Sequence, residues 1–432
     1  MASDLLRRFE QYMDRLSSLL GHADRVRPLR DYCHGLYSDS LRKSIEPLAA
    51  RLDPLRPVAK HQSLHHFVAN ADWSDADLLA GAHAQCRELF SRAKTRWLIL
   101  DDTTFPKKGM YSVGVARQYC GRLGKQENCQ TAVSWSLATP DYSLPIAYRL
   151  YLPEEEWAKD KERREKAGVP EDVVFKTKAQ IALDLLKALP KNVERGIVLA
   201  DAGYGNDTAF RNAIEEMELS YAVGVQGQTA VWLKGKGPTP VPQGSRKMGR
   251  PRTRLRREEG NAPLSLKQAA LQLESRRYRT VKWREGAKGV LSSRFAALRV
   301  RASHRDYQRS EPHPEEWLIV EWPKGESEPT KYFLSNLPKT TSLRDLVFNL
   351  KGRWRIERDY QELKSELGLS HFEGRGWRGF HHHGSLCIAA YAFLVAERGL
   401  FPPGPNPQRL QPPPLPKSYK PRRNPAYQAR KA

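Results

Sequence analysis

The sequence has no apolar run long enough to span a membrane, so it predicts no transmembrane helix. The first residues, MASDLLRRFEQYMDRL, are charged throughout, which argues against a secretory signal peptide. The cysteines are five, an odd number, and include no CxxC pair. This pattern argues against a disulfide framework and a structural zinc site, and it favours a reducing compartment. The cysteines are Cys33, Cys86, Cys120, Cys129 and Cys387.

Acidic residues are few relative to basic ones. The 432 residues include 72 Lys+Arg and 49 Asp+Glu, which gives a formal net charge of +23. A surplus of this size favours a polyanionic partner, because each phosphate neutralised by Lys or Arg releases condensed counterions. Nucleic acid is the leading candidate. An anionic membrane surface is the alternative, but the chain lacks a basic amphipathic helix with a strong apolar face.

The chain is long enough for two or three domains, at roughly 100–200 residues each. Residues 1–90 are predicted to be helical, because Leu5, Phe9 and Leu16 recur at helical spacing among charged residues. Ser74 followed by acidic residues predicts a further helix start. We interpret this segment as a helical N-terminal DNA-binding domain. A dimerisation or packing domain is an equally good interpretation.

Residues 91–225 have the pattern of an α/β fold. The apolar run at 97–100 predicts a buried strand that ends at Asp101-Asp102, and 196–201 predicts a second one that ends at Asp201. This order fits the first part of an RNase H-like core, a mixed sheet with flanking helices, although pattern alone permits other α/β folds. The remaining predicted elements are strands at 111–119, 130–138, 143–151 and 221–225 and helices at 175–189 and 206–217.

The second half of the chain begins with a segment that lacks this α/β pattern and ends with predicted helices. Residues 226–335 begin with a Pro/Gly/Arg-rich loop and continue with strand-like runs, which predicts a β-rich insertion. Residues 336–400 are predicted to supply the C-terminal helices of the catalytic core. Residues 401–432 contain ten prolines, seven Lys or Arg and no acid, and are predicted to be a disordered basic tail.

Two aspartates stand where carboxylates are needed for two-metal phosphoryl transfer. That chemistry requires several carboxylates around a pair of Mg²⁺ ions about 4 Å apart. Asp102 and Asp201 both follow predicted buried strands, so their side chains can meet at one edge of the sheet. Each of them alone is more simply explained as a turn-forming or capping residue.

A third acid is predicted on the helix that follows the insertion, RWRIERDYQELK at 353–364. On a helical wheel Arg353, Glu357 and Lys364 fall within about 40° of one another. Asp359, Glu362 and Glu366 point away from that stripe. One carboxylate between two cations suits a metal site beside a scissile phosphate. The simpler alternative is a surface ion pair between Arg353 and Glu357.

Three blocks of the sequence resemble those of one known protein family. The chain resembles DDE-type bacterial insertion-sequence transposases, whose RNase H-like core is interrupted by a β-rich insertion. The blocks are LILDDTTFPKKGMYSVGVARQYCGRLGKQENCQ at 98–130, VLADAGYG at 198–205 and GRWRIERDYQELKSELGLSHFEGRGWRGFHHH at 352–383.

The resemblance implies a catalytic triad of Asp102, Asp201 and Glu357. The first acid of the Asp-Thr-Thr-like motif maps to Asp102 rather than Asp101, and Glu357 belongs to a Tyr-x2-Arg-x3-Glu-x6-Lys signature. The tyrosine position of that signature is Leu350 here, which puts tyrosine-dependent handling of DNA ends in doubt. The three acids would hold two Mg²⁺ ions, for which Mn²⁺ would substitute.

The resemblance also implies the reaction and its partners. A metal-bound water would nick double-stranded DNA at the terminal inverted repeats of the element, and the freed 3′-hydroxyl would attack target DNA. Two ends must be brought together, so a dimer on DNA is expected. The implied location is the bacterial cytoplasm, in association with the nucleoid.

Several basic and aromatic residues are candidate DNA contacts. By analogy Arg353 and Lys364 would hold phosphates near the cut, and Lys107 and Lys108 follow the first acid closely. The Lys247–Arg252 segment resembles a minor-groove hook, and Trp283-Arg284 suits stacking on an unpaired base. Solvated lysines, a flexible basic loop and a core tryptophan are the simpler alternatives. The candidates are Arg353, Lys364, Lys107, Lys108, Arg250, Arg252, Trp283 and Arg284.

The consecutive histidines His381, His382 and His383 cannot all face one ion on a helix. We therefore predict a polar helix entrance with a possible phosphate contact rather than zinc ligands.

Two other functions remain open. A transposase-derived, non-catalytic DNA-binding regulator would need a broken triad, whereas all three acids are present. A general RNase H-like nuclease or junction resolvase would use the same acids, but the N-terminal domain, the insertion and the motif order argue against it.

Overall fold

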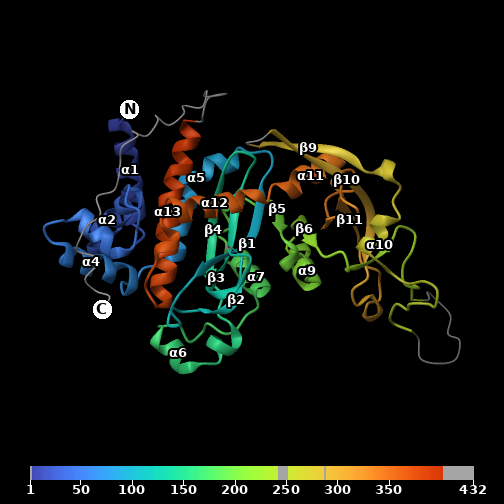
Figure 1. The fold of residues 1–432 in the computed structure, drawn as a ribbon, viewed down its shortest axis with the longest axis horizontal. Helices are drawn as coiled ribbons and strands as arrows, with labels where there is room; N and C mark the ends of the chain where they lie inside the picture. Colours follow the sequence, from blue (N-terminus) through green and yellow to red (C-terminus); the bar gives the residue numbers. More distant parts are fainter. Residues whose placement is uncertain (1, 122, 242–251, 287–288, 402–432) are drawn as a thin grey trace, which may run out of the picture.

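The structure is a computed structural model that describes residues 2–121, 123–241, 252–286 and 289–401. Within these ranges twelve strands form one mixed sheet, and helices flank its core half (Figure 1). The strand order is β2-β3-β1-β5-β6-β12-β11-β10-β7-β8, with β4 paired to β3 and β9 paired to β10. The predicted α/β class with a mixed sheet is therefore confirmed.

The first half of the chain supplies the strands of the core. They are β1 (Trp97–Pro106), β2 (Ala116–Cys120), β3 (Lys125–Ala138), β4 (Ser143–Leu150), β5 (Ile197–Ala200) and β6 (Tyr221–Val225). The later strands are β7 (Ala230–Leu233), β8 (Leu264–Ser265), β9 (Arg279–Gly286), β10 (Gly289–Ala302), β11 (Glu315–Glu321) and β12 (Lys331–Ser335).

The helices fall into an N-terminal group, short helices between the core strands and a C-terminal group. The first group is α1 (Ala2–Ser17), α2 (Val26–Tyr37), α3 (Ile45–Leu52), α4 (Pro57–Ala69) and α5 (Asp75–Ser91). The second is α6 (Lys161–Lys166), α7 (Lys178–Ala188), α8 (Ala202–Gly205), α9 (Thr208–Glu216) and, in the later β-rich segment, α10 (Leu266–Leu271). The third is α11 (Leu343–Lys351), α12 (Trp354–Ser365) and α13 (Trp377–Leu400).

The middle of the sheet is parallel. β1 pairs with β5 over Trp97–Ile99, and β5 pairs with β6, so the carboxyl ends of these strands share one edge. On its other side β1 pairs with antiparallel β3 along its whole length. This pairing carries β1 on to Pro106, so the prediction that the strand ends at Asp101-Asp102 is wrong. The two aspartates lie instead just beyond the point where β1 loses β5 as a neighbour.

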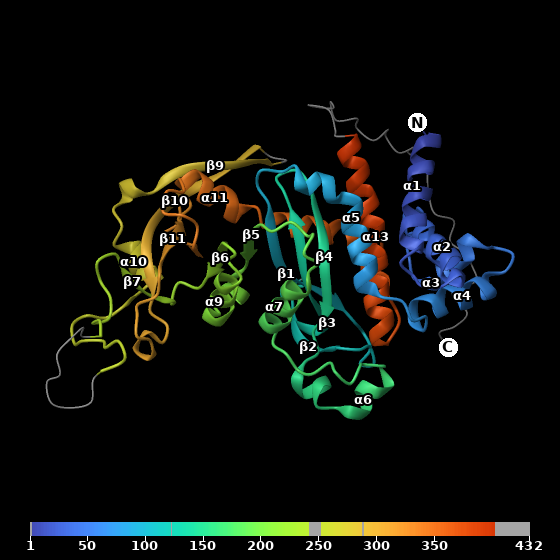
Figure 2. The same cartoon turned by 180° about the vertical axis from the view of Figure 1, so that it is seen from behind.

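Helices lie on both faces of the core. Trp135 of β3 donates from Nε1 to the carbonyl of Ala182 in α7, whereas the next residue, Ser136, donates to Asp359 in α12. Because successive side chains of a strand point to opposite faces, α7 and α12 must lie on opposite sides of the sheet. Figures 1 and 2, seen from the two sides, show the same arrangement.

Helix α13 lies between the sheet and helices α1–α4, and α5 packs beside it against β4 (Figure 2). It is buried on nearly every side, which explains its lack of a polar face. Tyr12 of α1 stacks on Phe393, and Arg8 pairs with Glu397 at 2.6 Å. Helices α1–α5 occupy most of residues 2–91. Among the described helices, α13 included, none is both long and apolar enough to cross a membrane.

The β-rich segment predicted at 226–335 extends the core sheet. β12 pairs antiparallel with β6, and β11, β10, β7 and β8 follow outward. β9 and β10 form a long hairpin that reaches back along α11 (Figure 1). Arg250 and residues 247–251 of the predicted hook lie outside the described residues, as does the predicted tail beyond residue 401.

Candidate active site

Asp101 and Asp102 lie side by side on β1 but face opposite sides of the sheet. Asp101 is paired with Ser134 of β3 and Asp102 with Val133. Ser134 is on the same face as Ser136, which contacts α12. Asp101 therefore faces α12, the helix that carries Glu357, and Asp102 faces α7.

Arg353 joins two carboxylates on the α12 face. Its Nη1 lies 2.8 Å from Oδ2 of Asp101, and its Nη2 lies 2.7 Å from Oε1 of Glu357. The ion pair expected from the i,i+4 spacing is therefore present, and the same guanidinium also reaches the strand. Glu357 remains the more accessible of the two acids, with 57% of its side chain exposed.

Burial is the main influence on Asp101. It raises the pKa of this carboxyl to about 6; Arg353 opposes the rise, and the negative charge of Asp201 adds to it. Although burial lowers the pKa of Arg353, the negative charges of Asp101, Glu357 and Asp201 hold it above its usual value. Arg353 is thus the common electrostatic partner of one carboxylate from each of three elements.

Asp201 directly follows β5 and begins α8. Its side chain accepts a hydrogen bond from the backbone N–H of Gly203 at 2.9 Å. This is the capping interaction that was the simpler alternative for an isolated aspartate. The cap uses Oδ1, so Asp201 has a second carboxylate oxygen for another role.

Asp102 is engaged on the other face. Tyr204 of α8 donates its hydroxyl to Oδ1 of Asp102, and Nζ of Lys178 in α7 lies 2.6 Å from Oδ2. Sequence reasoning missed both partners. Tyr204 lies in the GYG that follows Asp201, but neither residue carries a signal that links it to β1.

A cavity of about 710 Å³ opens along the α12 face beside β1. Its polar lining comes from both strand and helix. The residues include Asp101, Asp102, Thr103, Thr104, Glu357, Gln361, Lys364, Ser370 and His371.

The donor types at this site fit Mg²⁺ or Mn²⁺, since both ions prefer carboxylate oxygens. The guanidinium of Arg353 already occupies a position between carboxylates that favours a cation. As the side chains stand, however, no three Asp, Glu, His or Cys residues of the described chain are grouped closely enough to hold an ion. An ion would therefore require Arg353 to release at least one of its carboxylates.

The candidate phosphate contacts near the site differ in accessibility. Nζ of Lys364 donates to the carbonyl of Thr104 at 3.0 Å and lies over the ring of Phe105. Lys107 is largely buried and donates to the carbonyl of Phe372, and burial lowers its pKa to about 8. Lys108 is exposed.

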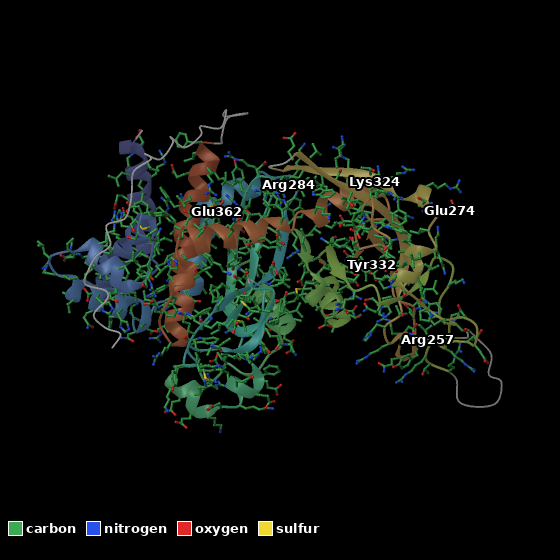
Figure 3. The ribbon with its side chains drawn as sticks, in the orientation of Figure 1. Arg257, Glu274, Arg284, Lys324, Tyr332 and Glu362 are labelled. Atoms are coloured by element: carbon green, nitrogen blue, oxygen red, sulfur yellow. The ribbon has the colours of Figure 1, made fainter. Side chains whose placement is uncertain are left out.

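The β9–β10 hairpin contacts the start of α12. Arg284 lies 3.8 Å from the ring centroid of Trp354, and Arg355 lies 4.5 Å from the same ring. Trp283 packs edge-on against Phe295 and is covered by Lys351. Figure 3 shows Arg284 at the end of the β-rich segment nearest α12 and Arg257 at its far end.

The remaining candidates lie elsewhere. Arg252 donates to the carbonyl of Pro240, within the loop that leads away from the core. The histidines of α13 are buried, so the predicted polar helix entrance with a phosphate contact is wrong. His382, for example, stacks on Trp73 at 3.6 Å and lies within hydrogen-bond distance of two backbone carbonyls. They are buried because α13 is covered on nearly every side over this part of its length.

Comparison with known proteins adds an independent finding. The family model described as DDE superfamily endonuclease matches residues 15–290. This range contains the aspartates of β1 and Asp201 but ends before Glu357. A probable transposase for insertion sequence element IS701 from Microchaete diplosiphon is 30% identical over 198 residues. The match covers 45% of this chain and 48% of that protein, so the chain spans about half the length of this curated relative.

Proposed function

The chain belongs to the DDE superfamily endonucleases, and we propose that it is a DNA transposase that cuts DNA at insertion-sequence ends and joins them to target DNA. The observation that carries the proposal is the shared guanidinium of Arg353, which lies between Asp101 of β1 and Glu357 of α12 beside Asp201. Carboxylates from a strand, a strand end and a helix are the arrangement that metal-dependent phosphoryl transfer needs.

The acids would hold two divalent ions, Mg²⁺ or Mn²⁺. When bound, such ions activate an attacking oxygen and stabilise the leaving oxygen of a phosphodiester. The residues of this chain supply the rest of the site. Before DNA binds, Arg353 neutralises the charge of the acids. When DNA is bound, its planar guanidinium would bind the scissile phosphate. Lys364, the second cation on the face of α12 that carries Arg353 and Glu357, lines the same cavity.

The identity of the first acid has two candidates. The motif predicts Asp102, and this assignment stands as one proposal. The face that Asp101 shares with Glu357 supports Asp101 as the other. If Asp102 is the ligand, it must first leave two side chains, Lys178 and Tyr204. Asp101 has one side-chain partner, Arg353, besides the backbone N–H of Asp102. We favour Asp101 on that ground.

The wider organisation is proposed in the same terms. Residues 1–90 form a DNA-binding domain, 91–225 and 336–400 form an RNase H-like core, and 226–335 form an insertion that carries DNA contacts. The net charge of +23 supports binding along an extended stretch of double-stranded DNA. We expect a dimer on paired element ends, acting on DNA in the bacterial cytoplasm.

The decisive experiment measures cleavage of linear DNA that carries the inverted repeats flanking the chain's own gene, with Mg²⁺ or Mn²⁺. Wild type should cut at the ends, and Glu357→Gln should bind the same DNA without cutting it. Glu362→Gln is the matched control, because Glu362 lies on the same helix but pairs with Arg358 and Arg398. Comparison of Asp101→Asn with Asp102→Asn then identifies the first acid.

Other outcomes favour other functions. Binding without cleavage by wild type favours a non-catalytic DNA-binding regulator derived from a transposase. Cleavage that does not depend on the inverted repeats favours a general RNase H-like nuclease or junction resolvase. Equal cleavage by wild type and Glu357→Gln rules out Glu357.

A further inference from the structure

Asp102 links three elements that are far apart in the sequence. One carboxylate oxygen accepts from the hydroxyl of Tyr204 in α8, and the other lies 2.6 Å from Nζ of Lys178 in α7. Tyr204 is almost fully buried, whereas Lys178 and Asp102 are partly exposed. The carboxylate therefore receives one bond from the protein interior and one from the surface.

Tyr204 belongs to the short turn that carries Asp201. The backbone N–H of Gly205 donates to the carbonyl of Asp201 at 2.8 Å, and Gly203 donates to its side chain. Arg211 holds the carbonyl of Gly205 from the other side. The turn is therefore a tightly bonded unit, and the Tyr204–Asp102 hydrogen bond connects this unit to β1.

We infer that Tyr204 and Lys178 are positioning residues that act through Asp102 to hold the Asp201 turn against the end of β1. The inference rests on the proposed function, because it concerns how the acids are brought together. Besides this connection, Asp201 is linked to the acids on the α12 face by the β1–β5 backbone pairing, which ends at Ile99, and by the charge of Arg353. Tyr204 and Lys178 act on the geometry of the metal site through Asp102 and do not themselves contact an ion.

The role of the Tyr204 hydroxyl can be tested separately from the packing of its ring. The ring packs against Phe210 at 5.9 Å, and Tyr204→Phe keeps that contact. The variant removes only the bond to Asp102. Tyr221→Phe is the matched control, because buried Tyr221 also donates to a buried carboxylate, that of Glu316. Tyr221 begins β6, at the end of the parallel strands opposite to the one that Asp201 follows.

The test is a calorimetric titration of Mn²⁺ into the full chain. Loss of a group that orients metal ligands typically weakens binding by about 10- to 100-fold. Tyr204→Phe should show a loss in this range, and Tyr221→Phe should bind as wild type does. In end cleavage, Tyr204→Phe should need correspondingly more Mn²⁺ but recover most of the wild-type rate at saturation.

Lys178→Met gives a second, independent result. We expect weaker Mn²⁺ binding, because the exposed side of Asp102 loses its partner. Tighter binding would overturn the inference, since it would mean that the ammonium competes with the ion for Asp102. Equal Mn²⁺ affinity of wild type, Tyr204→Phe and Tyr221→Phe would overturn it while leaving the proposed function intact. A wild-type chain that neither binds Mn²⁺ nor cuts DNA would overturn both.

Discussion

Arg353 and Asp101 lie 2.8 Å apart across 252 positions of the sequence, and this pair joins the start of α12 to the first core strand. The carboxylate is buried, and burial raises its pKa to about 6 even with Arg353 beside it. The ionised form of Asp101 therefore depends on the guanidinium over the pH range in which such an enzyme works.

Replacement of Arg353 by Met should have two separate effects. Cleavage should fall by about 100-fold or more, as for other lost transition-state contacts to phosphate. Without the guanidinium the pKa of Asp101 rises further, so Mn²⁺ binding should weaken at pH 6, where the acid is protonated. At pH 8 the acid is ionised, and loss of the guanidinium that competes for both carboxylates should strengthen Mn²⁺ binding. Calorimetry at the two pH values measures this. Arg358→Met is the control on the same helix, and an equal change at both pH values would contradict the account.

The sequence predicted one part of this site and missed another for a definite reason. The Arg353–Glu357 pair follows from helical spacing alone, and Asp201 follows from the end of a short apolar strand. The two-residue period of a strand also implies that Asp101 and Asp102 face opposite sides. It does not tell which side α12 covers, because that depends on contacts between β3 and α12 across more than 200 positions.

The same reasoning explains the other differences. β1 continues past its aspartates because β3 pairs with it as far as Pro106. No local pattern in the sequence of β1 predicts this pairing. The histidines of α13 were predicted to be exposed because they are polar. They are buried because α1–α4 and the sheet enclose α13 from opposite sides, and protein groups there bond the ring nitrogens. For example, Nδ1 of His381 lies 2.9 Å from the carbonyl oxygen of Trp377, and its Nε2 accepts from the backbone N–H of Leu150.

Asp359 should make the stability of the chain depend on pH. Its carboxylate is fully buried and accepts from Ser136, Ser143 and Tyr391, yet burial dominates and raises its pKa to about 6. Because the folded pKa lies above the unfolded one, this group favours folding fully below pH 4. That contribution is lost as the pH rises through 6, at a cost of roughly 3 kcal/mol.

Urea unfolding between pH 4 and pH 7 checks this effect in wild type and Asp359→Asn. The amide does not titrate, so the difference in unfolding free energy between the two proteins should change across this range in favour of the variant. A constant difference would show that the hydrogen bonds fully compensate for burial of the charge.

Lys107→Met should stabilise the protein. Burial lowers the pKa of this ammonium to about 8, so at pH 7 the folded state carries the whole cost of a buried charge. Its removal should add about 1 to 3 kcal/mol to the free energy of unfolding. The gain should shrink as the pH rises from 8 towards 10, where the wild-type amine loses its proton. Lys108→Met, at an exposed position, should leave stability unchanged, and a destabilised Lys107→Met would refute the argument.

Arg284 should contact DNA while it stacks on Trp354. Each phosphate contact contributes about 0.9 to the slope of log K against log salt concentration. Arg284→Ala should therefore reduce the magnitude of that slope by about one contact in fluorescence anisotropy titrations. Arg276→Ala serves as the control, because Arg276 is exposed on the same segment and pairs with Glu274. An unchanged slope for Arg284→Ala would mean that Arg284 only fastens the hairpin to α12.

Gly205 should tolerate no side chain, because its turn is pressed against β6. A Cβ atom at this position would lie 2.0 Å from the carbonyl oxygen of Gly224 and 2.9 Å from Cβ of Val223. Alanine is the better helix former by about 1 kcal/mol, but the overlap is with backbone and should outweigh that gain. We expect Gly205→Ala to lower the free energy of unfolding by about 3 kcal/mol and to weaken Mn²⁺ binding, since the displaced turn carries Asp201. Gly121→Ala, where a Cβ meets nothing within 4 Å, should change neither quantity. A Gly205→Ala protein as stable as wild type would show that the turn can move away from β6, and Mn²⁺ titration would then report whether Asp201 moves with it.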